Sequence, residues 1–138
     1  MKIVCYTEEQ YVKTYLKILQ YYYEETIVVS SFNDVLQFYK TSRSEWILIL
    51  DNKQVIINGD YSFLIPILID IPVISSIDVD YIVGGFTPKK LFCIKRPFTF
   101  EELNTKIKLV LKTSHNSIKL SEKYLSPNVN HFFKYPLL

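Results

Sequence analysis

The sequence lacks several features that would assign it to a class of protein at once. Its 138 residues include no alanine, three glycines and two cysteines. No stretch reaches the roughly 18 consecutive apolar residues of a membrane-spanning helix, so we expect no membrane span. The net charge is +2, and the charges are interspersed rather than gathered in a basic block. Charge alone therefore predicts no nucleic-acid or anionic-membrane partner.

The few cysteines and histidines also exclude a metal centre of the zinc type. Cys5 and Cys93 each lie in an apolar run, whereas His115 and His131 lie in the polar tail, and no pair has ligand spacing. Buried, reduced thiols are typical of cytoplasmic proteins. The first ten residues soon meet acidic side chains and do not resemble a signal peptide. We therefore predict a cytoplasmic protein.

Short strand-forming runs alternate with amphipathic segments along most of the chain. Three segments have the three- and four-residue apolar spacing of a helix, and they lie within 7–25, 32–43 and 96–112. Thr7 with Gln10 and Thr99 with Glu102 predict capping boxes for the first and third segments, and Asn33 or Asp34 could cap the second. The expected strands are 2–6, 26–32, 45–50, 71–77 and 91–95. This alternation predicts one α/β domain with a parallel sheet and helices on both faces.

The stretch after the third strand is ambiguous. Asn58-Gly59 lies between β-prone runs and predicts a hairpin. The following run "SFLIPILIDIP" predicts either a buried helix or a strand, and Pro66 disfavours the helix. The segment 78–90 contains Gly84, Gly85 and Pro88, so we expect it to be irregular.

Polar side chains follow the expected strands where each strand ends. They are Thr7, Glu8 and Glu9, then Asp51, then Ser75 and Ser76, and finally Lys95 and Arg96. In parallel sheets the carboxyl ends of the strands meet at one edge, where ligands and reactive groups gather. Asp51 could also be an ordinary turn residue, and the two glutamates could simply favour a helix N-terminus. A third alternative is that Lys95 or Arg96 pairs with Asp51, which would keep it ionised and replace a metal.

At this point four segments resemble the receiver domain of two-component response regulators. They are "KIVCYTEE", "WILILD", "IPVISS" and "IKRPFTFEEL", and the resemblance spans residues 1–113. It implies a flavodoxin-like (βα)5 three-layer sandwich with a parallel five-stranded sheet in the order 2-1-3-4-5. The third and fourth crossovers would be degenerate, because this region is rich in turn signals. The resemblance also implies a phosphoacceptor aspartate, an acidic pair that binds Mg²⁺, a hydroxyl residue and a lysine.

Asp51 matches the phosphoacceptor position of that family, and Glu8 matches the second acid. Thr7 replaces the first acid, and Lys53 stands where a backbone carbonyl usually helps to hold the metal. The hydroxyl position falls on Ile77 with Ser76 one place early, and the lysine position falls on Arg96 with Lys95 one place early.

These departures weaken the phosphotransfer site. Mg²⁺ prefers an octahedral oxygen shell with about two carboxylates. Glu8 and Asp51 could supply two, with Glu9 beside them. Thr7, however, lacks the negative charge of the acid that the family has at its position. Arginine differs from lysine in shape and donor geometry. We therefore expect an atypical receiver, largely independent of phosphorylation, without enzymatic activity and without a required cofactor. The alternative is a conventional Mg²⁺-dependent receiver phosphorylated on Asp51 by a histidine kinase. A flavodoxin-like enzyme or nucleotide binder is disfavoured, because no Gly-rich phosphate loop follows the first strand.

The resemblance further implies a homodimer. Winged-helix regulators of this family pair through the fourth helix, fifth strand and fifth helix. In this chain the candidate charges of that face are Glu101, Glu102, Lys106 and Lys108. Residues 114–138 are predicted to be a linker or the truncated start of an effector domain, so DNA would be contacted only through a part that is missing here.

Overall fold

The computed structural model describes residues 1–23, 25–42, 45–57, 61–79 and 87–115. The chain divides into two compact units, Met1–Lys106 and Ile107–Leu138. The sheet and the candidate site belong to the first unit. In the second unit the described residues are the end of the last helix, so the predicted linker or effector segment lies almost wholly outside the described residues.

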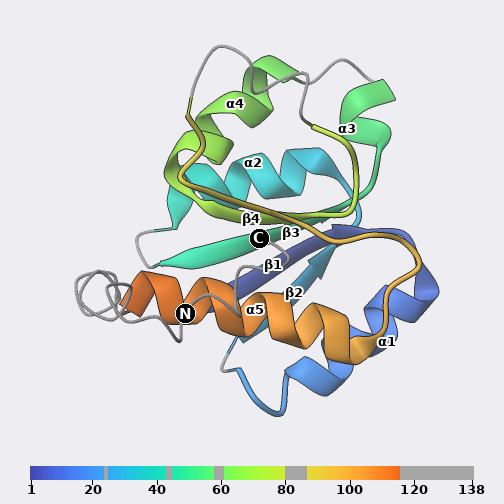
Figure 1. Ribbon diagram of the computed structural model, residues 1–138. Coiled ribbons are helices and arrows are strands. Elements are labelled where there is room, and N and C mark those ends of the chain that lie inside the picture. Colours follow the sequence, from blue (N-terminus) through green and yellow to red (C-terminus); the bar gives the residue numbers. More distant parts are fainter. Residues whose placement is uncertain (24, 43–44, 58–60, 80–86, 116–138) are drawn as a thin grey trace. The chain divides into compact units, whose positions relative to one another are not determined.

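The first unit contains a five-stranded, entirely parallel sheet in the order β2-β1-β3-β4-β5 (Figure 1). Its strands are β1 (Lys2–Thr7), β2 (Glu25–Val29), β3 (Trp46–Asp51), β4 (Pro72–Ser75) and β5 (Lys90–Cys93). This order and direction confirm the predicted flavodoxin-like α/β fold. The strand bounds differ by a few residues from the expected ones: β1 and β3 each extend by one polar residue, Thr7 and Asp51, whereas β2, β4 and β5 end two or three residues before the expected ends.

Five helices connect and flank the strands. They are α1 (Gln10–Leu19), α2 (Phe32–Thr41), α3 (Gln54–Ile57), α4 (Tyr61–Asp70) and α5 (Phe100–His115). In Figure 1, α2, α3 and α4 lie on one face of the sheet, and α1 and the first turns of α5 lie on the other. Among the described helices, none is both long and apolar enough to cross a membrane.

The core of the unit is formed on both faces of β1 and β3. All six residues of β3 are buried, as expected for a central parallel strand covered by helices on each side. Alternate residues point to opposite faces. One face packs against α2, α3 and α4 through Val4, Tyr6, Leu48, Leu50 and Val73. The other face presents Ile3, Cys5, Ile47, Ile49 and Ile74, all buried.

Asn58-Gly59 lies outside the described residues, but the runs on either side of it, which the hairpin prediction took as strands, are the helices α3 and α4, so that prediction is wrong. Three residues of α4, Leu64, Ile67 and Leu68, are fully buried at helical spacing. Burial of this apolar stripe outweighs Pro66, which lies on the exposed side of the helix. Tertiary packing thus decides between two local preferences that the sequence left open.

The crossovers around β4 are irregular, as predicted. Both α3 and α4 precede β4, and α3 has only four residues. Between β4 and β5, the described residues contain no helix, and 80–86 lie outside the described part. The bond between Arg96 and Pro97 is cis.

Two of the predicted helix caps need revision. Thr99 and Glu102 form the expected capping box of α5, in which the Thr99 N–H donates to Glu102 Oε1 at 2.8 Å and the Glu102 N–H donates to Thr99 Oγ1 at 3.1 Å. At α2, the cap is Ser31 rather than Asn33 or Asp34. At α1, the expected Thr7–Gln10 box is absent, because the helix begins later than expected: its cap residue is Glu9, which makes no side-chain cap bond.

Candidate functional site

The sheet register brings the ends of β1, β3 and β4 together. Thr7 pairs with Asp51 across β1 and β3, and Leu50 pairs with Ser75 across β3 and β4. Parallel pairing places the side chains of paired residues on the same face. Thr7 and Asp51 therefore lie side by side at the carboxyl edge, as the sequence predicted.

Asp51 is the centre of this edge, and its carboxylate is fully buried. Thr7 Oγ1 donates to Oδ2 at 2.5 Å. Ser76 Oγ and Arg96 Nε both donate to Oδ1, the latter at 2.9 Å. A buried charge needs such donors, because an unpaired carboxylate in a low dielectric is very costly. Both carboxylate oxygens are therefore occupied by the protein's own side chains.

Arg96 contributes the positive charge of the site. Besides its bond to Asp51 Oδ1, it donates from Nη2 to the Asp51 backbone carbonyl. Its Nη1 lies 3.8 Å from Glu9 Oε1, and its side chain is 34% exposed. Burial works to lower the Arg96 pKa, but the hydrogen bond and the charge of Asp51, together with Glu9, raise it above its usual value. The guanidinium is thus held by three oxygen atoms of two acidic residues.

Glu9 closes the network through the backbone. Its N–H donates to Thr7 Oγ1 at 3.0 Å, and the same hydroxyl donates to Asp51. Thr7, Glu9, Arg96 and Asp51 therefore form a closed ring of contacts. Thr7 is therefore the residue that ties β1 to the carboxylate of β3.

The two serines after β4 have different roles. Ser76 directs its hydroxyl at Asp51. Ser75 is turned to its own loop, where its Oγ donates to the Ile77 carbonyl at 2.7 Å and accepts from the Ile77 N–H at 3.2 Å. Ile77 packs against the apolar core. Of the two positions considered for the hydroxyl, the structure therefore brings Ser76, not Ile77, to the carboxylate.

Three other sequence candidates stay outside the network. The side-chain partners described for the Asp51 carboxylate are Thr7, Ser76 and Arg96. Glu8, Lys53 and Lys95 are exposed and are not among those partners. The acid that approaches the site is therefore Glu9, through Arg96, and the cation is Arg96 rather than Lys95.

The arrangement does not fit Mg²⁺ while Arg96 is in place. In the described part of the chain, no group of three or more His, Cys, Asp or Glu side chains is placed to hold a metal ion. The oxygens that would be its ligands, from Asp51 and Glu9, already face the guanidinium. A divalent ion would have to displace this cation.

Two residues near the site, Tyr11 and Asn52, were not among the candidates predicted from the sequence. The electrostatic interactions of Tyr11 include Asp51 and Arg96; burial first, and then the negative charge of Asp51, raise its pKa. Asn52 accepts the Gln54 N–H on Oδ1 at 2.9 Å, whereas its buried Nδ2 has no partner within the described residues. Tyr11 belongs to the apolar stripe of α1, and that pattern predicted only a residue packed against the core.

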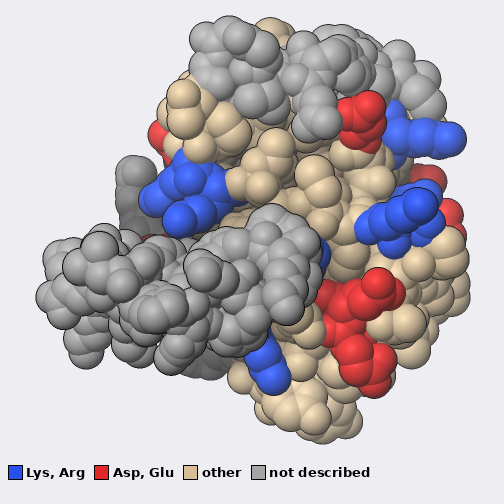
Figure 2. Space-filling model, viewed as in Figure 1, with Lys and Arg blue, Asp and Glu red and all other residues tan. Residues whose placement is uncertain are grey.

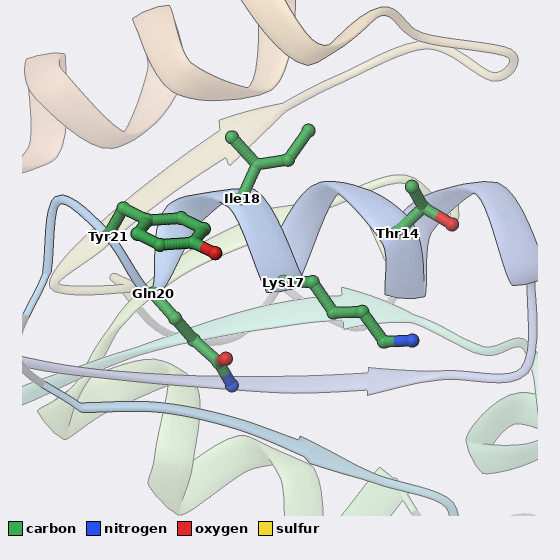
Figure 3. Close-up of a pocket in the computed structure, with 5 residues that line it drawn as sticks. All are labelled: Thr14, Lys17, Ile18, Gln20 and Tyr21. Carbon is green, nitrogen blue, oxygen red and sulfur yellow. The ribbon is translucent and has the colours of Figure 1, made fainter.

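Surface features elsewhere do not extend this network. Figure 2 shows acidic side chains gathered over the start of α5, where Glu101 and Glu102 lie in the first turn, and basic side chains in separate groups. A hollow on α1 and the turn that follows is lined by Thr14, Lys17, Ile18, Gln20 and Tyr21 (Figure 3). These lining residues include no carboxylate, thiol or imidazole.

Fold and site together define a flavodoxin-like α/β domain with a neutralised aspartate at the carboxyl edge of its sheet. Comparison with protein-family models, with curated proteins and with solved structures found no match to this chain.

Proposed function

We propose that the chain is an atypical response-regulator receiver domain that serves as a signal-input and dimerisation module of a transcriptional regulator, largely independently of phosphorylation. The observation that carries this proposal is the occupied carboxylate. Asp51 is buried, and Thr7, Ser76 and Arg96 satisfy both of its oxygens. A phosphodonor must reach a carboxylate oxygen, whereas here the carboxylate is buried and each of its oxygens already accepts a hydrogen bond from a side chain.

The free energy needed to move Arg96 away from Asp51 determines how rarely the carboxylate is open to a phosphodonor. Arg96 must release a charge-assisted hydrogen bond to Oδ1 and a second bond to the backbone of Asp51. Each hydrogen bond to a charged group contributes about 1.5–3 kcal/mol when buried. Because one third of the Arg96 side chain is exposed, water compensates part of the loss, and about 2–3 kcal/mol is a reasonable total. The open form would then be about one molecule in 30 to one in 150.

The direct test is exposure to a small phosphodonor. The protein is incubated with Mg²⁺ and acetyl phosphate, and its intact mass is measured at intervals. We expect the wild type to remain unmodified over the time in which a conventional receiver, run in parallel, becomes phosphorylated. One phosphoryl unit on the wild type that is absent from Asp51→Asn would contradict the proposal.

One observation favours the alternative of a conventional phosphoacceptor. Ser76 and Arg96 both donate to Asp51 Oδ1, and a hydroxyl and a cation are also the groups that would stabilise a phosphoryl group there. In that case Arg96 would swing aside and then neutralise the product, a histidine kinase would be the partner, and Mg²⁺ would be required. The same mass measurement separates the two functions.

The dimer is proposed on the surface around β5 and the start of α5. The strand β5 is an edge of the sheet, and Lys90, Leu91 and Phe92 are only half-buried. At the start of α5, Glu101 is exposed, whereas Glu102 is already used in the helix cap. Apolar contact would supply most of the binding energy, and rim charges such as Glu101 and Lys106 would set the register. Sedimentation at tens of micromolar tests this: a strict monomer contradicts constitutive pairing.

A further inference from the structure

Arg96 lies just before a segment that α1 holds by aromatic contacts. The Phe98 side chain is buried. Its ring centroid lies 5.6 Å from that of Tyr11 and 6.2 Å from that of Tyr15. The two tyrosine rings also contact each other edge to face at 5.6 Å. The two tyrosine rings thus hold Phe98, which lies two positions after Arg96, against α1.

A hydrogen bond reinforces these ring contacts. Tyr15 Oη donates to the Phe98 backbone carbonyl at 3.1 Å, and the Tyr15 ring also meets Phe100 at the start of α5 with a centroid distance of 6.0 Å. The backbone after Arg96 is therefore held through both its side chains and its main chain. Glu9, which contacts the guanidinium itself, is the residue immediately before α1.

We propose that the first two turns of α1, together with its cap residue Glu9, are a clamp that keeps Arg96 closed over Asp51. The clamp consists of Tyr11 and Tyr15 acting on Phe98 and of Glu9 acting on the guanidinium. Both sets of contacts come from one helix and its cap, so a displacement of α1 loosens Arg96 from the backbone side and the charge side at once. Tyr11, Tyr15 and Phe98 are positioning residues: they act on Asp51 only through Arg96. The inference deepens the proposed function, since it names what keeps the carboxylate covered.

The clamp makes a specific prediction about the Arg96 side chain. The chain contains two arginines, Arg43 and Arg96, so an ¹⁵N spectrum contains two Nε–H signals, and Arg43→Lys assigns them. Hydrogen exchange of the Arg96 Nε–H measures how often its bond to Asp51 opens. The backbone amide of Leu48, in the middle of β3, reports global unfolding in the same sample.

Two variants loosen the clamp, and each has a matched control. Tyr15→Phe removes only the hydroxyl that bonds Phe98. Its control is Tyr23→Phe, which removes a hydroxyl that donates to Asn104 Oδ1 at 3.3 Å. Phe98→Leu removes the ring contacts but keeps an apolar side chain. Its control is Phe38→Leu, which removes a ring whose centroid lies 4.8 Å from that of Trp46.

We expect Tyr15→Phe to accelerate exchange of the Arg96 Nε–H about fivefold, the effect of one neutral hydrogen bond, and Phe98→Leu to accelerate it about tenfold, because aromatic pairing is lost with the ring. The two controls should leave it within about twofold of the wild type. Exchange that is unchanged in either clamp variant overturns the proposal. So does an acceleration that matches that of the Leu48 amide, because it would show general destabilisation.

The result is independent of the test of the proposed function. A wild type that accepts a phosphoryl group refutes phosphorylation independence but leaves the exchange comparison valid. Conversely, a wild type that stays unmodified while the clamp variants exchange like the controls refutes the clamp alone.

Discussion

The energetic coupling between Asp51 and Arg96 can be measured with a double-mutant cycle. The variants are Asp51→Asn, Arg96→Met and the double variant, and the quantity is the free energy of unfolding in urea. Trp46 is the only tryptophan of the chain and is buried, so its fluorescence reports unfolding directly. Methionine keeps much of the aliphatic volume of arginine, which limits loss of packing.

The expected values follow from burial. Removing one partner of a buried ion pair costs about 3–5 kcal/mol; because Arg96 is 34% exposed, we discount this to about 2–3 kcal/mol for Arg96→Met. Asp51→Asn leaves a guanidinium that can reach water and Glu9, and should cost about 1–2 kcal/mol. The double variant should cost less than the sum, because neither charge is left unpaired. We expect a coupling energy of about 1.5 kcal/mol.

A surface pair in the same unit is the control for this cycle. Lys2 Nζ lies 3.5 Å from Glu25 Oε1, and both side chains are substantially exposed. The double-mutant cycle of this pair should give a coupling energy of about 0.2–0.5 kcal/mol. If the Asp51–Arg96 coupling is no larger than that of this control pair, the guanidinium does not neutralise the carboxylate in solution, and the reasoning about the occupied site is refuted.

Three further outcomes follow from other contacts. Thr99→Ala should lower the free energy of unfolding by about 1 kcal/mol through loss of the α5 cap, whereas Thr105→Ala, at an exposed site inside the same helix, should not lower it; equal losses would argue against the capping box. In the native protein a thiol reagent should modify Cys93, which is exposed, and not Cys5, which is buried; rapid modification of both would contradict the described core. Burial, and then the charge of Asp51, raise the pKa of the Cys5 thiol well above its ordinary value of 9.0, so the unfolded thiol ionises first. The free energy of unfolding should therefore fall above about pH 9, by up to about 1.4 kcal/mol per pH unit, and this contribution should be missing in Cys5→Ala.

The parallel sheet, and the meeting of Thr7 and Asp51 with one of the cations after the last strand, were predictable from the sequence pattern, whereas the strand order was implied only by the resemblance to receiver domains. Buried parallel strands such as "WILILD" are apolar throughout, and their carboxyl ends must share one edge of the sheet. Apolar periodicity also located α1, α2 and α5. These features depend on the pattern of many residues, and single exceptions do not change them.

The predictions that were wrong, and the residues that were missed, depend on competition between neighbouring groups. Asn58-Gly59 has the local preference of a hairpin, but burial of Leu64, Ile67 and Leu68 favours helices around it. Thr7 could cap α1 or bond Asp51, and a one-dimensional sequence does not show that the carboxylate is within reach. The choice of Ser76 over Ile77 depends on the turn after β4, where Ser75 bonds the Ile77 backbone. Tyr11 was missed because an aromatic stripe is equally typical of an ordinary core.

The measurement that tests the central claim most directly is the intact mass of the wild type after incubation with Mg²⁺ and acetyl phosphate, compared with that of Arg96→Ala. If the guanidinium covers Asp51, the wild type stays unmodified and still unfolds cooperatively with its Asp51–Arg96 coupling intact. A phosphoryl group that appears on Asp51 of the wild type as fast as on Arg96→Ala would show that Arg96 covers nothing, and would contradict the account.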